Sequence, residues 1–485
     1  MLDTKRCMAK NYFYNLLLTL ANILFPILSF PYVSRVLGPE GIGKVQLAFS
    51  FSQYFGMIAG FGIPIYGMKE IARYRDDKEG RSMIFSELTT IYLLTSIAMS
   101  VFYIAAVYIF PYFKAEKGLF NIALLMVLFG CTYIEWVYTG MEEFKSIALR
   151  SAAFKIIGLL AMYVLIRQAS DYKIYLFIMI FSFLGNNILS FFLLRGKVRF
   201  TVSGLQLRRH LRPLILIWGT TLVAVMADLD TVLIGFLADN KAVGFYTAAV
   251  KLSKVSIPVI TSMSVILMPK IAKYFADGEM DNVQAMLDKA FNFVVFFGVP
   301  IAFGLALLAP DFIILFSGRE FTEAITSMRV LALLPLVMGF SHFFLFLILV
   351  PAGRNREMFI SEFIGLLISL ILNFALIPYF RQTGSAVADI FSETSIIALY
   401  FYFIARRFKF NFRWSLVLKA VVSSLTFIPL MLFFKSFSLS SFYMIAISVA
   451  SCVVVYLCIQ SLIFKSDFVN NTADLIKMKL KTEKA

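Results

Sequence analysis

Apolar runs long enough to cross a lipid bilayer recur along almost the whole of this chain, separated by short segments that carry most of the charges. Of the 485 residues, 60% are hydrophobic and only 15% are charged. Soluble globular proteins contain about 45–50% apolar and about 25% charged residues, so a soluble, disordered or disulfide-stapled class is excluded. Because one membrane-spanning helix uses ~20 apolar residues, the runs predict an all-α polytopic membrane protein with about fourteen transmembrane helices.

The first run is preceded by basic residues, as in a signal peptide, but it is too long for a signal sequence and no cleavage site of small residues follows. We therefore expect it to be retained as the first span. An even number of spans places both termini on one side of the membrane. The predicted spans are 11–33, 45–66, 84–110, 119–138, 151–166, 174–194, 213–237, 243–274, 290–308, 325–350, 359–378, 384–405, 414–434 and 440–464.

Basic residues are distributed unevenly between the two sides. If the N-terminus is inside, the inner segments hold 31 of the 45 Lys and Arg residues and the outer loops hold 10. The positive-inside rule then predicts that both termini are cytoplasmic. The same rule accounts for the formal net charge of +16, which in a soluble protein would point to nucleic acid. We therefore expect no nucleic-acid partner.

The chain contains an internal repeat with an offset of 200 residues. The segments Met68–Tyr74 and Met268–Tyr274 match in their Met, Ile, Ala, basic and Tyr positions, and glycine-containing pairs precede both, at 37–43 and at 234–244. Six predicted spans separate the copies, so the repeats are parallel and related by a pseudo-twofold axis along the membrane normal. We predict a six-helix lobe at residues 1–210, a second six-helix lobe at 211–408, and two additional helices with a cytoplasmic tail at 409–485.

Two aspartates lie within the seventh predicted span. A charged side chain in hydrocarbon costs at least about 2.5–3.5 kcal/mol, so such residues are expected to face a cavity or a partner. Asp228 and Asp230 are two residues apart and therefore point to opposite faces of a helix. At most one of them faces a given cavity, and we favour Asp228; Asp230 is equally well explained as a cap near the outer boundary.

Two lysines lie on one face of the eighth predicted span. Lys251 and Lys254 share this face with Thr247 and Pro258, and Lys254 falls near the middle of the span. A cationic stripe at that depth suits an anionic substrate such as a phosphate head group. The alternative is a structural ion pair between Lys254 and Asp228 of the preceding helix.

Polar stripes on other spans are consistent with a water-filled lumen. Asn15 and Asn22 lie on one stripe of the first span, while Glu362 and Glu393 lie on the stripes of the eleventh and twelfth. Hydrogen bonding between helices explains the Asn residues equally well. Glu135 lies near the inner end of the fourth span, where it need only be interfacial.

Known catalytic motifs are absent from the sequence. The four cysteines lie in or beside apolar segments and lack the spacing of a metal or redox site, and there are only two histidines. We expect no enzymatic activity, no cofactor and no bound metal.

Four segments carry a resemblance to a known family: 30–43, 133–145, 227–252 and 373–388. Together they resemble Wzx-type O-antigen and polysaccharide flippases, which belong to the multidrug/oligosaccharidyl-lipid/polysaccharide flippase superfamily and have a MATE-like fold. The resemblance extends over nearly the whole chain. It is specific at the level of the superfamily and weaker for the substrate.

The resemblance implies a fourteen-helix flippase of the bacterial inner membrane. It would move an undecaprenyl-pyrophosphate-linked oligosaccharide from the cytoplasmic to the periplasmic leaflet by alternating access, coupled to H⁺ or Na⁺. Arg35 of the first segment joins the substrate-binding candidates Lys254, Lys251, Asn15 and Asn22. The candidates for ion coupling are Asp228, Glu362 and Glu393. A polysaccharide polymerase and a chain-length regulator are the expected protein partners.

Two other functions are compatible with parts of this pattern. A small-molecule or drug cation antiporter would share the fold and carry a different cargo. A membrane polysaccharide polymerase or ligase would need a sizeable periplasmic loop, and the longest predicted outer segment, 309–324, is too short. Transport of fluorescent cations in vesicles would separate the antiporter from a flippase.

Overall fold

The computed structural model describes residues 2–226, 229–437 and 440–465. Helices dominate these residues, and the β-structure among them is a single bridge between Arg195 and Val198. The chain forms two compact units, Met1–Thr247 and Ala248–Ala485. The predicted lobe boundaries at 210 and 408 stay a prediction.

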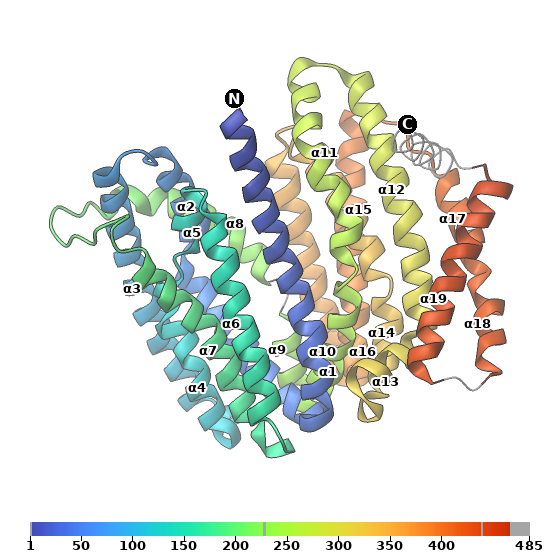
Figure 1. Cartoon of the computed structure of the whole chain (residues 1–485), viewed down its shortest axis with the longest axis horizontal. Helices are drawn as coiled ribbons and strands as arrows, with labels where there is room; N and C mark the ends of the chain where they lie inside the picture. Colours follow the sequence, from blue (N-terminus) through green and yellow to red (C-terminus); the bar gives the residue numbers. More distant parts are fainter. Residues whose placement is uncertain (1, 227–228, 438–439, 466–485) are drawn as a thin grey trace. The chain divides into compact units, whose positions relative to one another are not determined.

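The helices are labelled as in Figure 1. Those that begin in the first unit are α1 (Leu2–Gly60), α2 (Ile63–Arg73), α3 (Lys78–Ile109), η1 (Pro111–Glu116), α4 (Lys117–Leu128), η2 (Gly130–Thr132), α5 (Glu135–Gly140), α6 (Phe144–Leu165), η3 (Ala169–Asp171), α7 (Tyr172–Leu193), α8 (Arg208–Met226), α9 (Asp230–Leu237) and α10 (Asn240–Lys254). Those of the second unit are α11 (Ile257–Asp277), α12 (Met280–Leu307), α13 (Ala309–Ser317), η4 (Arg319–Phe321), α14 (Ala324–Leu331), α15 (Leu334–Phe344), η5 (Leu345–Leu349), α16 (Asn355–Arg407), α17 (Ser415–Leu425), α18 (Phe427–Lys435), α19 (Ser441–Cys458) and η6 (Ile459–Ile463).

Two of these helices are too long for one crossing. At 1.5 Å per residue, the 59 residues of α1 and the 53 of α16 would each extend more than twice the ~30 Å of a bilayer core. Each is broken by one residue with a positive φ, Gly38 in α1 (φ 65°) and Arg381 in α16 (φ 53°). In Figure 1 the dark blue ribbon of α1 runs down from the N-terminus and turns at its lower end. Helix α16 therefore contains the predicted spans 359–378 and 384–405. Helix α1 contains the predicted span 11–33 and most of the span 45–66, which is interrupted by the turn at residues 61–62 before α2.

The all-α membrane fold is confirmed. Within the described residues, ten helices are long and apolar enough to cross a membrane, or eleven if the bent pair Pro111–Leu128 and Gly130–Gly140 forms one span. The number of fourteen spans stays a prediction. Many large apolar side chains are exposed, among them Val101, Leu160 and Leu432 at 60% or more, as expected for a surface that faces lipid.

The predicted eighth span is not one continuous helix. It is divided into α10 and α11 by a turn at residues 255–256, and Pro258 lies in the first turn of α11. Proline has no N–H to donate to the carbonyl four residues earlier, which belongs to Lys254, so the helix ends there. The face that we expected to carry Thr247, Lys251, Lys254 and Pro258 is therefore interrupted.

Polar contacts in the first unit gather at two opposite ends. At one end, Arg75 pairs with Glu142 at 2.9 Å and Lys197 pairs with Glu143. At the other end, the Tyr112 hydroxyl donates to the Gly235 carbonyl at 2.6 Å. The first group joins segments that were predicted to be inner, and the second joins a predicted outer loop to the outer end of the predicted seventh span. The predicted alternation of loops agrees with these contacts, whereas the orientation of the termini stays a prediction.

Candidate functional site

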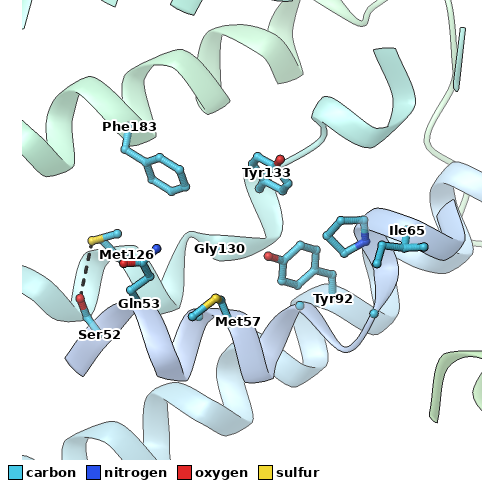
Figure 2. Close-up of a pocket in the computed structure, with 13 residues that line it drawn as sticks. Ser52, Gln53, Met57, Ile65, Tyr92, Met126, Gly130, Tyr133 and Phe183 are labelled. Carbon is cyan, nitrogen blue, oxygen red and sulfur yellow. Dashed lines mark hydrogen bonds between the residues drawn. The ribbon is translucent and has the colours of Figure 1, made fainter. Parts of the chain in front are cut away.

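A cavity of about 370 Å³ lies within the first unit, where several helices break. Its walls come from the second half of α1, the start of α2, the middle of α3, the bend between α4 and α5, and α7 (Figure 2). The backbone interruptions next to it are the turn between α1 and α2 and the segment η2. Irregular backbone at membrane depth is tolerated where it lines a cavity, and ligand sites of transporters form there.

The cavity wall is mainly apolar, with a few polar groups. Figure 2 shows the aromatic rings of Tyr92, Tyr133 and Phe183 around the space, and the Tyr133 and Phe183 rings are stacked with centroids 6.3 Å apart. Ser52 is buried and its hydroxyl contacts the Met126 sulfur at 3.6 Å. Apolar walls with a few fixed polar groups are typical of binding sites for organic ligands.

A cluster of charged and amide side chains continues from the cavity. The Tyr133 hydroxyl lies 3.5 Å from one Glu135 carboxylate oxygen, and the Asn186 amide donates to the other at 3.3 Å. Lys155 of α6 donates to the Asn22 side-chain oxygen and is close enough to Glu135 to interact with it electrostatically. The cluster therefore joins α1, α5, α6 and α7 through polar groups at membrane depth.

This cluster changes the interpretation of two residues. The count of inner basic residues includes Lys155, although it lies inside the predicted fifth span 151–166. Helix α6 begins at Phe144 and places Lys155 three turns inside the helix. Glu135 was interpreted as interfacial, yet it is half-buried and hydrogen-bonded to Asn186. Their contacts are with Asn22 and Asn186, which are far away in the sequence, so periodicity could not pair them.

The predicted residues of the first span fall in different places. Asn22 belongs to the cluster just described, while the side chain of Asn15 lies outside the described residues. Arg35 is exposed near the break at Gly38, and its guanidinium donates to the Pro31 carbonyl at 2.8 Å. Asn22 alone of these three is thus placed at the candidate site.

The predicted lysines lie at the end of α10. Lys251 is half-buried, Lys254 is exposed, and Thr247, which was expected to share their face, is buried. Lys254 is the last residue before the break that precedes Pro258. Their role in binding substrate stays a prediction.

Two of the three predicted ion-coupling residues, Glu362 and Glu393, lie within the described part of the chain. Glu362 is half-buried and accepts a hydrogen bond from the Tyr400 hydroxyl at 2.8 Å, and Glu393 is close enough to that hydroxyl to act on it electrostatically. The structure therefore gathers both carboxylates around Tyr400 in α16. Asp228 lies outside the described residues, whereas Asp230 is buried in the first turn of α9.

A buried ion-pair cluster fixes the start of α8. Glu87 has a side-chain exposure of 0%; it pairs with Arg209 and lies 2.8 Å from His210 Nε2. The other ring nitrogen of His210 lies 2.9 Å from the Tyr66 hydroxyl. The sequence placed His210 in a loop and gave no sign of these partners. The cluster joins α2, α3 and α8 and is a structural anchor.

Comparison with known proteins decides the family. The model of the polysaccharide biosynthesis protein family matches residues 8–275, which is more than half of the chain. The chain belongs to this family. The resemblance to polysaccharide flippases is thereby confirmed at the level of the family.

Relatives of this family member match along most of its length. The protein named "Putative O-antigen transporter" from Shigella dysenteriae is 22% identical over 394 residues, covering 80% of this chain and 98% of the relative. The solved structure of the lipid II flippase MurJ in an inward closed conformation has a TM-score of 0.74 at 16% identity and covers 94% of this chain and 99% of that chain. An inward-facing multidrug resistance MATE family transporter has a TM-score of 0.64 at 15% identity, covering 79% and 94%. The fold of this chain is therefore similar to that of these two solved structures.

Proposed function

We propose that the protein is a flippase that moves an undecaprenyl-pyrophosphate-linked oligosaccharide, such as an O-antigen or exopolysaccharide repeat unit, across the bacterial inner membrane. The observation that carries this proposal is the alignment with an O-antigen transporter relative over 98% of that relative's length. The family match and the flippase-like fold support it. Transfer is from the cytoplasmic to the periplasmic leaflet, with both termini cytoplasmic.

The described site supplies the groups that such a cargo needs. A lipid-linked sugar presents hydroxyl groups, a pyrophosphate and a long apolar chain. Tyrosine hydroxyls and the amides of Gln53 and Asn186 can hydrogen-bond sugar hydroxyls, whereas cationic side chains stabilise a pyrophosphate. Lys251 and Lys254 are our candidates for the pyrophosphate, and Lys155 provides a further cation in the first unit.

The proposed coupling ion is H⁺ or Na⁺. A carboxylate at membrane depth can bind either ion and return to its hydrogen-bonded state when the ion leaves. Glu362 and Glu393 around Tyr400 are the predicted candidates, together with Asp228. Glu135 is an additional candidate because its carboxylate lies next to both Lys155 and the cavity residue Tyr133. A polymerase and a chain-length regulator are the proposed partners downstream.

The second candidate is a small-molecule cation antiporter, which the MATE-like fold favours. Such a transporter would take up fluorescent organic cations in vesicles, and a flippase would not. We further propose that the chain is not an enzyme, because its relatives and structural neighbours are named as transporters and flippases.

Deletion of the gene in its native host tests the cargo. We expect lipid-linked repeat units to be synthesised and to accumulate on the cytoplasmic leaflet, while surface polysaccharide is lost. Loss of repeat-unit synthesis would contradict a flippase and favour an enzyme. Complementation with the intact chain should restore surface polysaccharide.

A further inference from the structure

The glycine pairs of the internal repeat meet one another in the structure. Gly43 lies in α1, one turn after the break at Gly38, and Gly244 lies in the first turn and a half of α10. A methyl group built on Gly43 would lie 1.7 Å from the Asn240 carbonyl oxygen. A methyl group built on Gly244 would lie 2.0 Å from the Pro39 carbonyl oxygen. No side chain fits at either position without moving backbone.

The two contacts are reciprocal. Gly43 and Gly244 differ by 201 in number, and so do the carbonyl-bearing residues Pro39 and Asn240. Each glycine therefore packs against the carbonyl four residues before the other glycine. This exchange is what a twofold axis between two equivalent helices produces. The second half of α1, after Gly38, and α10 both begin at the end of the first unit that was predicted to be periplasmic.

Further contacts join the same elements. The Tyr112 hydroxyl donates to the Gly235 carbonyl at 2.6 Å. Leu47 is buried against Gly235, and one of its methyl carbons would lie 2.6 Å from a Cβ atom built on Gly235. A hollow of about 200 Å³ lies beside them, and Lys44, Leu47 and Asn240 are among its lining residues. Tyr112 precedes the fourth span and Gly235 ends the seventh, so this hydrogen bond also joins the two repeats.

We infer that the reciprocal contact of Gly43 and Gly244 is a lock that holds the predicted periplasmic side closed. In membrane proteins, glycine lets two helix backbones approach closely and so increases the van der Waals contact between them. This contact is lost as soon as the helices separate. Cargo release to the far leaflet requires that separation. The inference rests on the proposed alternating access. It assigns a function to the glycine pairs that the substrate site does not explain.

Cysteine labelling in cells tests the lock. Leu47→Cys is introduced into a chain whose own four cysteines are replaced, and a membrane-impermeant maleimide is added to spheroplasts. Leu47 is 2% exposed, so labelling is expected to be slow while the contact is intact. Gly43→Ala and Gly244→Ala should each raise the labelling rate by about tenfold or more, because the added methyl groups overlap backbone. The two variants should resemble each other because the contacts are reciprocal.

Two further variants make the experiment decisive. Gly304→Ala, in α12, meets nothing within 4 Å and should leave the rate unchanged. Tyr112→Phe removes the 2.6 Å hydrogen bond without adding bulk and should raise the rate about two- to tenfold, even if the glycine variants do not accumulate. If labelling is unchanged in Tyr112→Phe and in every glycine variant that accumulates, the contact does not hold the periplasmic side closed and the inference is wrong.

Labelling does not depend on cargo, so the lock and the flippase can fail separately. If the variants are labelled faster but deletion of the gene leaves the repeat units on their normal leaflet, the lock is supported and the proposed function is rejected. If labelling of the variants is unchanged but deletion of the gene traps repeat units on the cytoplasmic leaflet, only the lock is rejected.

Discussion

The buried carboxylate of Glu87 is the sharpest test of how the first unit is held together. It accepts hydrogen bonds from the Gln206 backbone N–H at 2.7 Å, from His210 at 2.8 Å and from Arg209, and it is 0% exposed. Glu87→Gln keeps the shape of the side chain, but it removes the charge and one of its two acceptor oxygens. At least one buried donor then loses its acceptor, which costs about 1–3 kcal/mol, and the charge-assisted bond to His210 weakens as well.

We therefore expect Glu87→Gln to destabilise the first unit by about 2–4 kcal/mol. For a unit of this size that corresponds to a fall of roughly 5–15 °C in melting temperature, measured on purified protein in detergent with a thiol-reactive dye. Arg75→Gln is the matched control: the Arg75 and Glu142 side chains of its ion pair are 41% and 51% exposed, so its loss should cost less than about 1 kcal/mol. A Glu87→Gln protein that melts with the wild type would refute the assignment of this cluster as an anchor of α8.

Three further predictions concern the proposed transport cycle and the second unit. Lys254→Arg should retain partial transport and Lys254→Glu should lose it while the protein still accumulates; recovery of both abundance and transport in a double Lys254→Ala, Asp228→Ala variant would show an ion pair instead of a binding site. Glu362→Gln keeps an acceptor for Tyr400 and should preserve the fold while ion-driven transport is lost, which a comparison of gradient-dependent and gradient-free flipping measures. Burial raises the pKa of Asp311 in α13, against the effect of Lys435 and a hydrogen bond with Ser441. The wild-type protein should therefore become less stable as the pH rises from about 3.9, the usual pKa of an aspartate, through the raised pKa of Asp311 in the folded protein. The melting temperature of Asp311→Asn should not show this fall with pH.

The sequence predicted those features that depend on local pattern. Apolar length predicted the membrane-spanning class, and the paired glycines at 37–43 and 234–244 indicated a repeat before their contact was known. The break in the eighth span also had a local signal, because Pro258 cannot donate to the carbonyl of Lys254. The prediction of one continuous face through Pro258 is therefore wrong, because the helix ends before it.

The candidate site depends on contacts that local pattern does not contain. Lys155 is accommodated inside α6 because Asn22, 133 residues earlier, accepts its hydrogen bond. Glu135 lies beside Asn186, 51 residues later, at a bend that begins near Gly130. A charge near the end of an apolar run is compatible both with an interfacial position and with a paired position inside the membrane. Only the packing of the helices distinguishes the two.

The central claim is movement of a lipid-linked oligosaccharide between leaflets, and a reconstituted system measures it directly. Purified protein is incorporated into liposomes that contain undecaprenyl-pyrophosphate-linked oligosaccharide, and a membrane-impermeant glycosidase reports the fraction of sugar that faces outward. We expect the protein to move the protected fraction into the accessible leaflet, faster with an H⁺ or Na⁺ gradient and more slowly in Lys254→Glu. If the protected fraction is the same with and without protein, while a fluorescent organic cation crosses the membrane, the protein is an antiporter and the account is wrong.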